Sequence, residues 1–389
     1  MQKFNFYVPR IEFGSGRLKE LGELCKRFGN KAFLAIDPNL DKIGVGDEVI
    51  KNLKKSSIET VKFTEIEPNP SCFAVDRGGE VARKAGSQFV IGLGGGSSMD
   101  LGKGVAVLAN HPGPSWQYTE RTDHEVLRPN AAKMLPIVCI PTTSGTGSEV
   151  SPFAVFNNPK VKAKATLRSD LVIPTLSLVD PELTISLPPQ GTAYTGIDAL
   201  AHAIESYYGL AATPVSKAMS LEAIRLGFIY LPQAFANGKN LEAREQMAWA
   251  CILAGVGLAH GIIALPHALG QPVGGIFGAP HGGTLAACLI KCLEITIPAD
   301  IKSFAEVAEA MDPDVRSLPL RARAEKVPEL MERLYKDVNC KAKFSDWGMK
   351  ESDIDRVTDL ALTAYGYDMK LNPRQVTVEE VKEIYRQCI

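Results

Sequence analysis

The sequence lacks several features that would mark it for particular classes of function. Its formal net charge is only −1 over 389 residues, so it offers no electrostatic reason to bind nucleic acid or an anionic membrane surface. Its eight cysteines are scattered without a Cys-x-x-Cys pair, which indicates reduced thiols and a cytoplasmic location rather than a disulfide framework. No basic segment followed by an apolar one marks the N-terminus as a secretory signal. Internal repeats and low-complexity segments are also absent.

One apolar run approaches the length of a membrane span. Residues 247–265 are apolar apart from His260, but three glycines interrupt the run and Pro266 follows it. A transmembrane helix needs about 20 apolar residues. We therefore expect a helix buried in the protein core, with the glycines allowing close packing, and no membrane partner.

The first half of the chain alternates strand and helix patterns. Hydrophobic content of 45% and charged content of 22% are those of an ordinary globular protein, and the length suggests two domains. This alternation predicts a parallel sheet with helices on its faces. The expected strands cover residues 10–14, 31–36, 60–63, 89–93 and 136–140. The expected helices cover residues 19–28, 44–55 and 72–85.

The second half reads as helices alone. The segment Leu187-Pro-Pro-Gln-Gly191 marks a boundary, beyond which strand signals fade. We therefore predict an α/β domain over residues 1–187 and an all-α domain over residues 188–389. Thr377-Val-Glu-Glu380 forms a capping box for the last helix. The expected helices cover residues 192–209, 214–231, 241–265, 281–296, 301–311, 319–336, 352–366 and 377–387.

A glycine-rich loop, Gly94-Gly-Gly-Ser-Ser-Met-Asp100, follows the strand expected at residues 89–93 and opens a helix. Glycines in this position let backbone N–H groups approach a phosphate at the positive end of the helix, which favours a nucleotide diphosphate. A plain tight turn is the alternative. The loop departs from the usual dinucleotide fingerprint, because Ser97 stands sixth from Gly92 where that motif has Gly or Ala. The expected acid lies upstream instead, as Asp37.

A second loop, Pro141-Thr-Thr-Ser-Gly-Thr-Gly-Ser-Glu149, is dense in hydroxyls and glycine. Such a loop can hydrogen-bond a phosphate, a ribose or a nicotinamide amide. A long surface turn is the alternative, but the apolar strand before it favours the carboxyl edge of the sheet, where ligands bind.

Four side chains of the second half form a candidate metal site. Asp198 and His202 are four positions apart and so share a helix face, and His267 and His281 follow in the same largely apolar region. One carboxylate and three imidazoles suit Fe(II) or Zn(II). Taken singly, each residue is more simply a buried or capping side chain. The helical pair, together with the Pro-His-Gly-Gly turn at residues 280–283, favours a metal.

These motifs together resemble the iron-containing (group III) alcohol dehydrogenase family. Two of the shared segments, Pro-Thr-Thr-Ser-Gly-Thr-Gly-Ser-Glu and Gly-Ile-Asp-Ala-Leu-Ala-His-Ala-Ile-Glu, are very specific. The match covers nearly the whole chain. The resemblance implies a dinucleotide-binding α/β domain, a helical domain, an active site in the cleft and a homodimer. The shared segments are Gly-Gly-Gly-Ser, Pro-Thr-Thr-Ser-Gly-Thr-Gly-Ser-Glu, Gly-Ile-Asp-Ala-Leu-Ala-His-Ala-Ile-Glu, Pro-His-Gly and Asn-Pro-Arg374.

The resemblance also implies roles for individual residues. The four candidate ligands would bind one metal, usually Fe(II), although Zn(II) suits the same set. The glycine-rich loop would hold the pyrophosphate through Gly96 and Ser97, and we assign Gly94, Gly95 and Asp100 to the same cofactor site. The nicotinamide and ribose site would be lined by Asn69, Thr142, Thr143, Thr146, Val155 and Lys164.

Asp37 occupies the position that the family associates with NAD rather than NADP. A carboxylate accepts hydrogen bonds from a ribose diol and repels a 2′-phosphate. The alternative for Asp37 is an Asp-Pro turn at a strand end. The reaction implied is hydride transfer between NAD(H) and a small alcohol, aldehyde or ketone, with the metal acting as a Lewis acid on the substrate oxygen.

Two positions depart from the family pattern. Gln271 stands four residues after the third ligand, where the family commonly has another histidine, and a Gln side chain cannot take up and pass on a proton at neutral pH. His260 stands where the family usually has Asn or a small residue. Because His260 lies seven positions before His267, our hypothesis is that it reaches the pocket and takes over substrate contact or proton relay. A core histidine is the alternative.

Two other functions stay open at this stage. Dehydroquinate synthase and glycerol-1-phosphate dehydrogenase share the general architecture, but their phosphorylated substrates would need cationic side chains near the metal. Residues 192–290 offer Lys217, Arg225, Lys239 and Arg244, none adjacent to a ligand in the sequence. A non-catalytic binding protein of the same fold is the other alternative, against which the complete set of four ligands argues.

Overall fold

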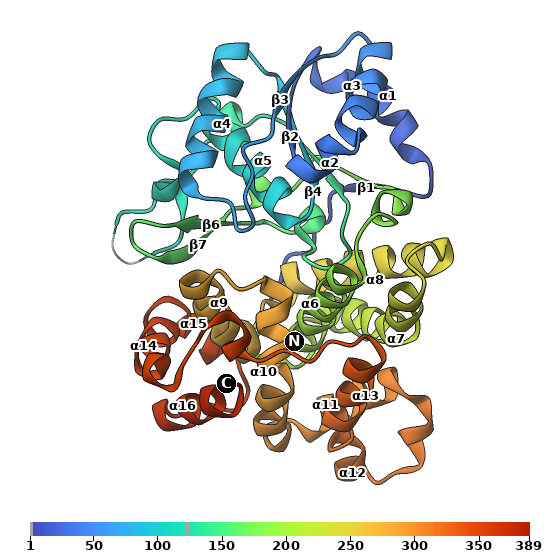
Figure 1. Cartoon of the computed structure of the whole chain (residues 1–389), viewed down its shortest axis with the longest axis vertical. Coiled ribbons are helices and arrows are strands. Elements are labelled where there is room, and N and C mark those ends of the chain that lie inside the picture. Colours follow the sequence, from blue (N-terminus) through green and yellow to red (C-terminus); the bar gives the residue numbers. More distant parts are fainter. Residues whose placement is uncertain (1–2, 122–123) are drawn as a thin grey trace. The chain divides into compact units, whose positions relative to one another are not determined.

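The computed structural model of the chain describes residues 3–121 and 124–389, and it divides into two compact units (Figure 1). The sheet unit comprises Val8–Thr143 and Ser148–Ile185. The helical unit comprises Ser186–Ile389, the described part of Met1–Tyr7, and the short segment Ser144–Gly147.

The sheet unit is built on six parallel strands in the order β1-β8-β5-β4-β2-β3. This confirms the parallel sheet expected from the alternation of strands and helices. All residues of β4 and β5 are buried, as strands covered on both faces should be. The strands are β1 (Arg10–Phe13), β2 (Lys31–Ile36), β3 (Glu59–Phe63), β4 (Phe89–Gly94), β5 (Ile137–Pro141) and β8 (Leu176–Val179).

Helices cover both faces of the sheet, and the residues of β2 show how (Figure 1). Phe33 and Ala35 point to one face, where they join the buried cluster that includes residues of α4 (Cys72–Ala85) and α5 (Gly96–Leu108). Leu34, between them, points to the opposite face and packs with residues of α1 and α3. These two helices are α1 (Leu21–Cys25) and α3 (Val45–Lys55), and the short α2 (Pro38–Lys42) lies between them in the chain.

An antiparallel hairpin, β6 (Phe153–Asn158) and β7 (Ala163–Arg168), forms a separate two-stranded sheet that the sequence did not predict. The sequence of β6 shows no alternation of apolar and polar residues, because this strand has apolar residues on both of its faces. Ala154 and Phe156 are fully buried, whereas Phe153 and Val155 are only partly so.

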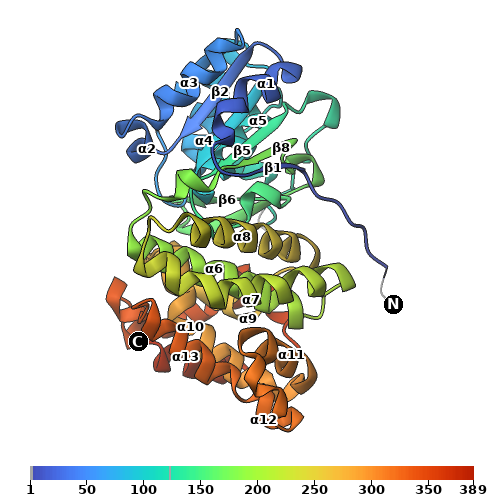
Figure 2. The ribbon, with the colours of Figure 1, turned by 90° about the vertical axis from the view of Figure 1, so that its right-hand side faces the viewer.

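Three long helices of the helical unit pack against one another and run side by side in Figure 2. They are α6 (Pro189–Tyr208), α7 (Pro214–Ala236) and α8 (Leu241–Gly261). Every residue of α6 from Gly196 to Tyr208 is buried, so this helix lies inside the unit. The remaining α-helices are α9 (Leu265–Phe277), α10 (His281–Thr296), α11 (Ile301–Met311), α12 (Leu320–Ala324), α13 (Val327–Asp337), α14 (Ile354–Ala364), α15 (Gly366–Lys370) and α16 (Val378–Gln387), whose capping box at Thr377 and Glu380 is present as expected.

The apolar run at residues 247–265 forms a buried helix, but the helix ends earlier than expected. After Gly261 the chain bends by 102° into α9. Ile262 has φ 59° and ψ 174°, a conformation that a β-branched residue rarely adopts, and Pro266 cannot continue a helix from the preceding turn. The stretch His281–Ala299 is long and apolar enough to cross a membrane, but 61% of its apolar window is buried inside the structure.

The segment Ser144–Gly147 packs its backbone against two helices of the helical unit. A Cβ atom on Gly145 would lie 2.7 Å from the carbonyl oxygen of Thr195 in α6. One on Gly147, which has φ +62°, would lie 2.5 Å from the Cα of Gly255 in α8. Such distances leave no room for a side chain, so glycine is required at both positions.

We expect Gly147→Ala to lower the free energy of unfolding by about 3 kcal/mol, because it adds both left-handed strain and overlap with Gly255. Gly86→Ala is the matched control, since Gly86 also has positive φ but no atom lies within 4 Å of its added Cβ. The control should lose only about 1 kcal/mol. Urea denaturation followed by tryptophan fluorescence measures both, and equal losses would contradict the close packing of this segment.

Candidate functional site

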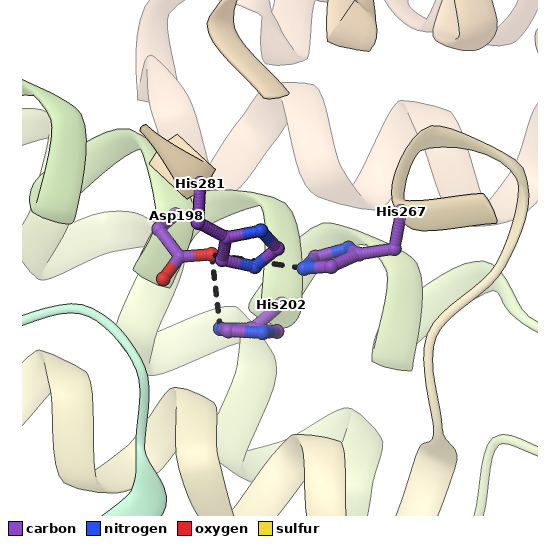
Figure 3. A group of neighbouring side chains, drawn as sticks. All are labelled: Asp198, His202, His267 and His281. Atoms are coloured by element: carbon purple, nitrogen blue, oxygen red, sulfur yellow. Dashed lines mark ion pairs between the residues drawn. The ribbon is translucent and has the colours of Figure 1, made fainter. Parts of the chain in front are cut away.

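Four side chains from three helices converge in the helical unit (Figure 3). Asp198 and His202 lie one turn apart on α6, His267 lies in the first turn of α9, and His281 is the first residue of α10. One ligand atom from each lies within 4.8 Å of the other three. The structure thus brings together the four residues that the sequence suggested as metal ligands.

The separations among these atoms match those around a small cation. Asp198 Oδ1 lies 3.4 Å from His281 Nε2, 3.6 Å from His267 Nε2 and 3.7 Å from His202 Nδ1. Ligands held about 2.1 Å from an ion in a tetrahedral arrangement lie about 3.4 Å from one another. The three distances from Asp198 Oδ1 are therefore close to those between ligands of one ion, and they are too long for strong hydrogen bonds.

Two of these atoms lack the interactions that buried polar atoms normally have. Asp198 Oδ1 and His267 Nε2 are both buried and have no hydrogen-bond partner among the described residues. Unsatisfied buried polar atoms are destabilising, typically by about 1–3 kcal/mol each. A divalent cation between them would satisfy both, so the residues present fit a metal ion.

The electrostatics of the four residues also favour a positive charge at this point. Burial raises the pKa of the Asp198 carboxyl, but the His202, His281 and His267 rings outweigh it and lower that pKa well below its usual range. Burial lowers the pKa of His267, but the carboxylates of Glu205 and Asp198 raise it to about 10. Asp198 is therefore a carboxylate, and its surroundings favour a cation beside it, either a proton or a metal ion.

Glu205 is a residue of this site that the sequence reasoning missed. It is fully buried on α6, and its carboxylate accepts a hydrogen bond from His267 Nδ1 at 2.5 Å. The available signal was its spacing, because Glu205 lies three residues after His202 and so on the same side of the helix. Its partner is 62 residues away in the sequence, and nothing local indicates that pairing.

The glycine-rich loop of the sheet unit joins β4 to α5. A Cβ on Gly94, which has φ +144°, would meet Ser98 Oγ at 2.4 Å and Asp37 Cβ at 3.3 Å. A Cβ on Gly95 would lie 3.5 Å from Thr143 Cγ2, and Thr142 N donates to the Gly94 carbonyl at 2.9 Å. The loop therefore brings the N-terminus of α5 close to the ends of β2 and β5, as a phosphate-binding turn requires.

A chain of hydrogen bonds links three of the residues assigned to the cofactor. Asn69 N donates to Ser97 Oγ at 3.1 Å, and Lys164 Nζ donates to Asn69 Oδ1 at 2.6 Å. Burial lowers the pKa of Lys164 to about 8. Asn69 has φ 55°, so its backbone is held in the left-handed region beside the glycine-rich loop. Ser97, Asn69 and Lys164 thus lie together, while Gly96 begins α5.

Asp100 supports the hydroxyl-rich loop from within the sheet unit. Its Oδ1 accepts from Ser148 Oγ at 2.6 Å and its Oδ2 accepts from Val155 N at 2.9 Å. Because both oxygens have partners, its assignment to the cofactor stays a prediction. Thr146 belongs by its contacts to the helical unit, whereas Thr142 and Thr143 belong to the sheet unit.

Asp37 ends β2 and caps α2. Its Oδ1 accepts hydrogen bonds from Asn39 N at 2.7 Å and Leu40 N at 3.4 Å. The Asp-Pro turn is thus present, as the alternative reading of this residue proposed. Both hydrogen bonds use the same oxygen of Asp37, and the role of this residue in selecting NAD stays a prediction.

The two positions that depart from the family pattern lie in different surroundings. Gln271 follows His267 by one turn of α9 and is partly buried. His260 is buried near the end of α8, where its Nε2 bonds the Tyr7 carbonyl at 2.9 Å. Its ring also contacts the rings of Phe6 and Tyr7. These are the contacts of a residue that anchors the N-terminal segment, and its catalytic role stays a prediction.

We expect His260→Ala to leave the pH profile of kcat/KM unchanged and to lower the free energy of unfolding by about 1–2 kcal/mol, because it removes the partner of the Tyr7 carbonyl. His260→Gln is the matched control: its amide can still donate to Tyr7 but cannot relay a proton. If both variants lost the same limb of the pH profile, His260 would be a proton relay after all.

Comparison with known proteins supports one family over both units. The choline dehydrogenase of Bacillus subtilis (strain 168) is 36% identical over 394 residues, covering 100% of this chain and 96% of the relative. The NAD-dependent methanol dehydrogenase of Bacillus methanolicus is 32% identical over 387 residues, covering 99% of this chain and 100% of the relative. The crystal structure of a 1,3-propanediol oxidoreductase superposes with a TM-score of 0.94 at 35% identity, covering 100% of both chains.

Two family models divide the chain between them. The model described as iron-containing alcohol dehydrogenase matches residues 9–181, and the one described as the C-terminal part of the Fe-containing alcohol dehydrogenase family matches residues 192–389. The second match includes all four residues of the candidate metal centre. The chain therefore belongs to the iron-containing alcohol dehydrogenase family.

Proposed function

We propose that this protein transfers hydride between NAD(H) and a small primary alcohol or its aldehyde, using one iron ion held by Asp198, His202, His267 and His281. The observation that carries the proposal is the convergence of four ligand atoms, all within 4.8 Å of one another, in a chain of this family. Asp198 Oδ1 and His267 Nε2, which are buried without hydrogen-bond partners among the described residues, support it further.

The names of the relatives support the substrate class. One relative is named for choline, one for methanol and one for 1,3-propanediol, and each of these compounds has a primary hydroxyl group. They differ in size and charge, so they favour the shared CH₂OH group rather than any one compound. We infer that this chain acts on a short primary alcohol or aldehyde.

The helical unit would provide the oxygen-binding side of the reaction. A divalent iron held by these four residues would supply Lewis-acid polarisation of the substrate oxygen, which makes an alcohol more acidic and a carbonyl more electrophilic. Asp198 contributes the single negative charge of the ligand set, and three neutral imidazoles leave most of the charge of the ion available. No side chain of the set has to act as a nucleophile, so the task of the protein is to position the reactants.

The sheet unit would hold the cofactor. The amide groups at the N-terminus of α5 and the hydroxyl of Ser97 suit the pyrophosphate, because an anion is stabilised at a helix N-terminus. Asp37, beside Gly94, suits the ribose hydroxyls and disfavours a 2′-phosphate. The NAD-dependence in the name of the methanol dehydrogenase supports the same choice.

A phosphorylated substrate has weaker support. Two of the four cationic side chains of residues 192–290 have other partners: Arg244 donates to Thr192 Oγ1 and the Leu187 carbonyl, and Arg225 pairs with Glu222. Neither is free to form a phosphate site at the metal centre.

A cytoplasmic location is supported by the eight cysteines, all of which are free and buried.

We expect the protein reconstituted anaerobically with Fe(II) to oxidise NADH in the presence of short aldehydes, and to lose this activity on chelation. His281→Ala should lower bound iron and reduce kcat/KM by at least about 100-fold. His281 is the best position to change because its side chain is 31% exposed, whereas that of Asp198 is 3% exposed, so its loss leaves a smaller buried defect.

Elemental analysis and an NADH-oxidation assay over a panel of aldehydes measure both effects. Full turnover by metal-free protein, or iron binding without any aldehyde-dependent turnover, would contradict the proposed function.

We expect Asp37→Asn to raise the ratio of kcat/KM for NADPH to that for NADH by about 10-fold, because it removes repulsion of the 2′-phosphate worth about 1.4 kcal/mol. Asn keeps an oxygen that can cap α2. Asp37→Ala is the matched variant: it should change cofactor preference similarly but also lower stability by about 1 kcal/mol. An unchanged preference in both variants would leave Asp37 with the capping role alone.

A further inference from the structure

One face of α6 carries three acidic or imidazole side chains. Asp198, His202 and Glu205 are spaced by four and three residues, so they form one stripe along the helix. The first two belong to the candidate metal centre. Glu205 does not belong to that centre, yet it is 0% exposed. Carboxylates are rarely buried so completely unless they have a partner.

The partners of Glu205 all lie at the start of α9. Its Oε1 is 2.5 Å from His267 Nδ1, while its Oε2 accepts from Ala264 N at 2.6 Å and from His267 N at 3.5 Å. One carboxylate therefore binds the ring of a candidate ligand and the backbone that carries that ring. This joins α6, which supplies two ligands, to α9, which supplies a third.

The geometry also determines which nitrogen of His267 is free to bind an ion. Backbone N–H groups only donate, and an ionised carboxylate only accepts, so the Nδ1 that faces Glu205 carries its proton and donates it. The lone pair of the neutral ring is then on Nε2. That atom lies 3.6 Å from Asp198 Oδ1 and is buried with no hydrogen-bond partner among the described residues.

The loop that Glu205 holds is strained. Ile262 has φ 59°, and it stands between the end of α8 and Ala264, whose N–H binds Glu205. A β-branched residue persists in this conformation only where the surrounding contacts impose it. The two hydrogen bonds that Glu205 accepts from Ala264 N and His267 N lie just beyond the strained residue and fix the path of the chain into α9.

We propose that Glu205 is a positioning residue for the metal centre, which fixes the orientation and tautomer of His267 and thereby sets the affinity of the centre for its ion. The inference rests on the proposed function in one respect, namely that an ion binds at these four residues. Carboxylates that hold metal-binding histidines in this way typically account for about 10- to 100-fold in metal affinity.

Glu205→Gln tests the proposal because it keeps the shape of the side chain and removes one acceptor. If its remaining oxygen accepts from Ala264 N, its NH₂ group faces His267 Nδ1. Two donors then oppose each other unless the proton of the ring moves to Nε2, where it would block the ion. Either result should weaken metal binding by about 10- to 100-fold.

Tyr208→Phe is the matched control on the same helix. Tyr208 is also buried on α6, and its hydroxyl has no hydrogen-bond partner among the described residues. It is not one of the candidate ligands, and its replacement removes only an oxygen atom. Metal affinity should therefore equal that of the unmodified protein.

The experiment uses metal-free full-length protein under anaerobic conditions. Fe(II) affinity is measured by competition with a chromophoric chelator, the visible spectrum of the Co(II)-loaded protein reports the ligand set, and thermal unfolding of the metal-free protein reports stability. The proposal is supported if Glu205→Gln weakens Fe(II) binding at least about 10-fold and alters the Co(II) spectrum. Iron affinity and a Co(II) spectrum equal to those of the unmodified protein would overturn it.

The remaining outcomes are also decisive. If Glu205→Gln does not fold, Glu205→Asp is judged by the same criteria, since a shorter carboxylate cannot reach both His267 Nδ1 and Ala264 N. A loss of affinity in Tyr208→Phe as large as that in Glu205→Gln would overturn the proposal, because any disturbance of α6 would then have the same effect. Failure of the unmodified protein to bind Fe(II) would instead contradict the proposed function.

Discussion

The attraction between one buried carboxylate and a positive charge is the constraint on which this structure depends. Asp198 is 2% exposed, and three imidazole rings surround its Oδ1. That oxygen and His267 Nε2 are buried and have no hydrogen-bond partner among the described residues, and a cation between them would satisfy both. The helices that supply the imidazole groups therefore surround a site suited to a positive charge, in addition to burying apolar surface.

The chain meets this constraint by using α6 as a fixed support. Because α6 is buried from Gly196 to Tyr208, its side chains have few alternative conformations, and two ligands on it are positioned by the helix itself. His267 and His281 come from separate helices and need other support. For His267 that support is Glu205, while His281 lies directly after Pro280 at the start of α10.

Much of this arrangement could be predicted from the sequence, because it follows from local patterns. The strand at residues 31–36 and the helix at residues 72–85 have the predicted bounds, since their apolar spacing and flanking turn residues agree. The i,i+4 pair of Asp198 and His202 is likewise a local pattern. The grouping of His267 and His281 with them was suggested by their scarcity and by family resemblance, and only the structure gives their separations.

The features that were missed depend on contacts that are distant in the sequence. The hairpin of β6 and β7 lacks visible alternation, and the break after Gly261 depends on the unusual conformation of Ile262. The pairing of Glu205 with His267 spans 62 residues. The contact of His260 with Tyr7 spans 253 residues, and no local pattern in the sequence indicates it.

The division of the chain into units has a consequence for engineering. The chain passes between the two units four times, after Tyr7, Thr143, Gly147 and Ile185. The short segment Ser144–Gly147 also places the Gly145 carbonyl 3.3 Å from His202 Nδ1. Consider a chimera that takes the first half of its chain from one relative and the second half from another, with a single crossover between them. Its segment 144–147 would then come from one relative, whereas the His202 that this segment contacts would come from the other. Recombination between relatives should exchange that segment together with the helices, not with the strands on either side of it.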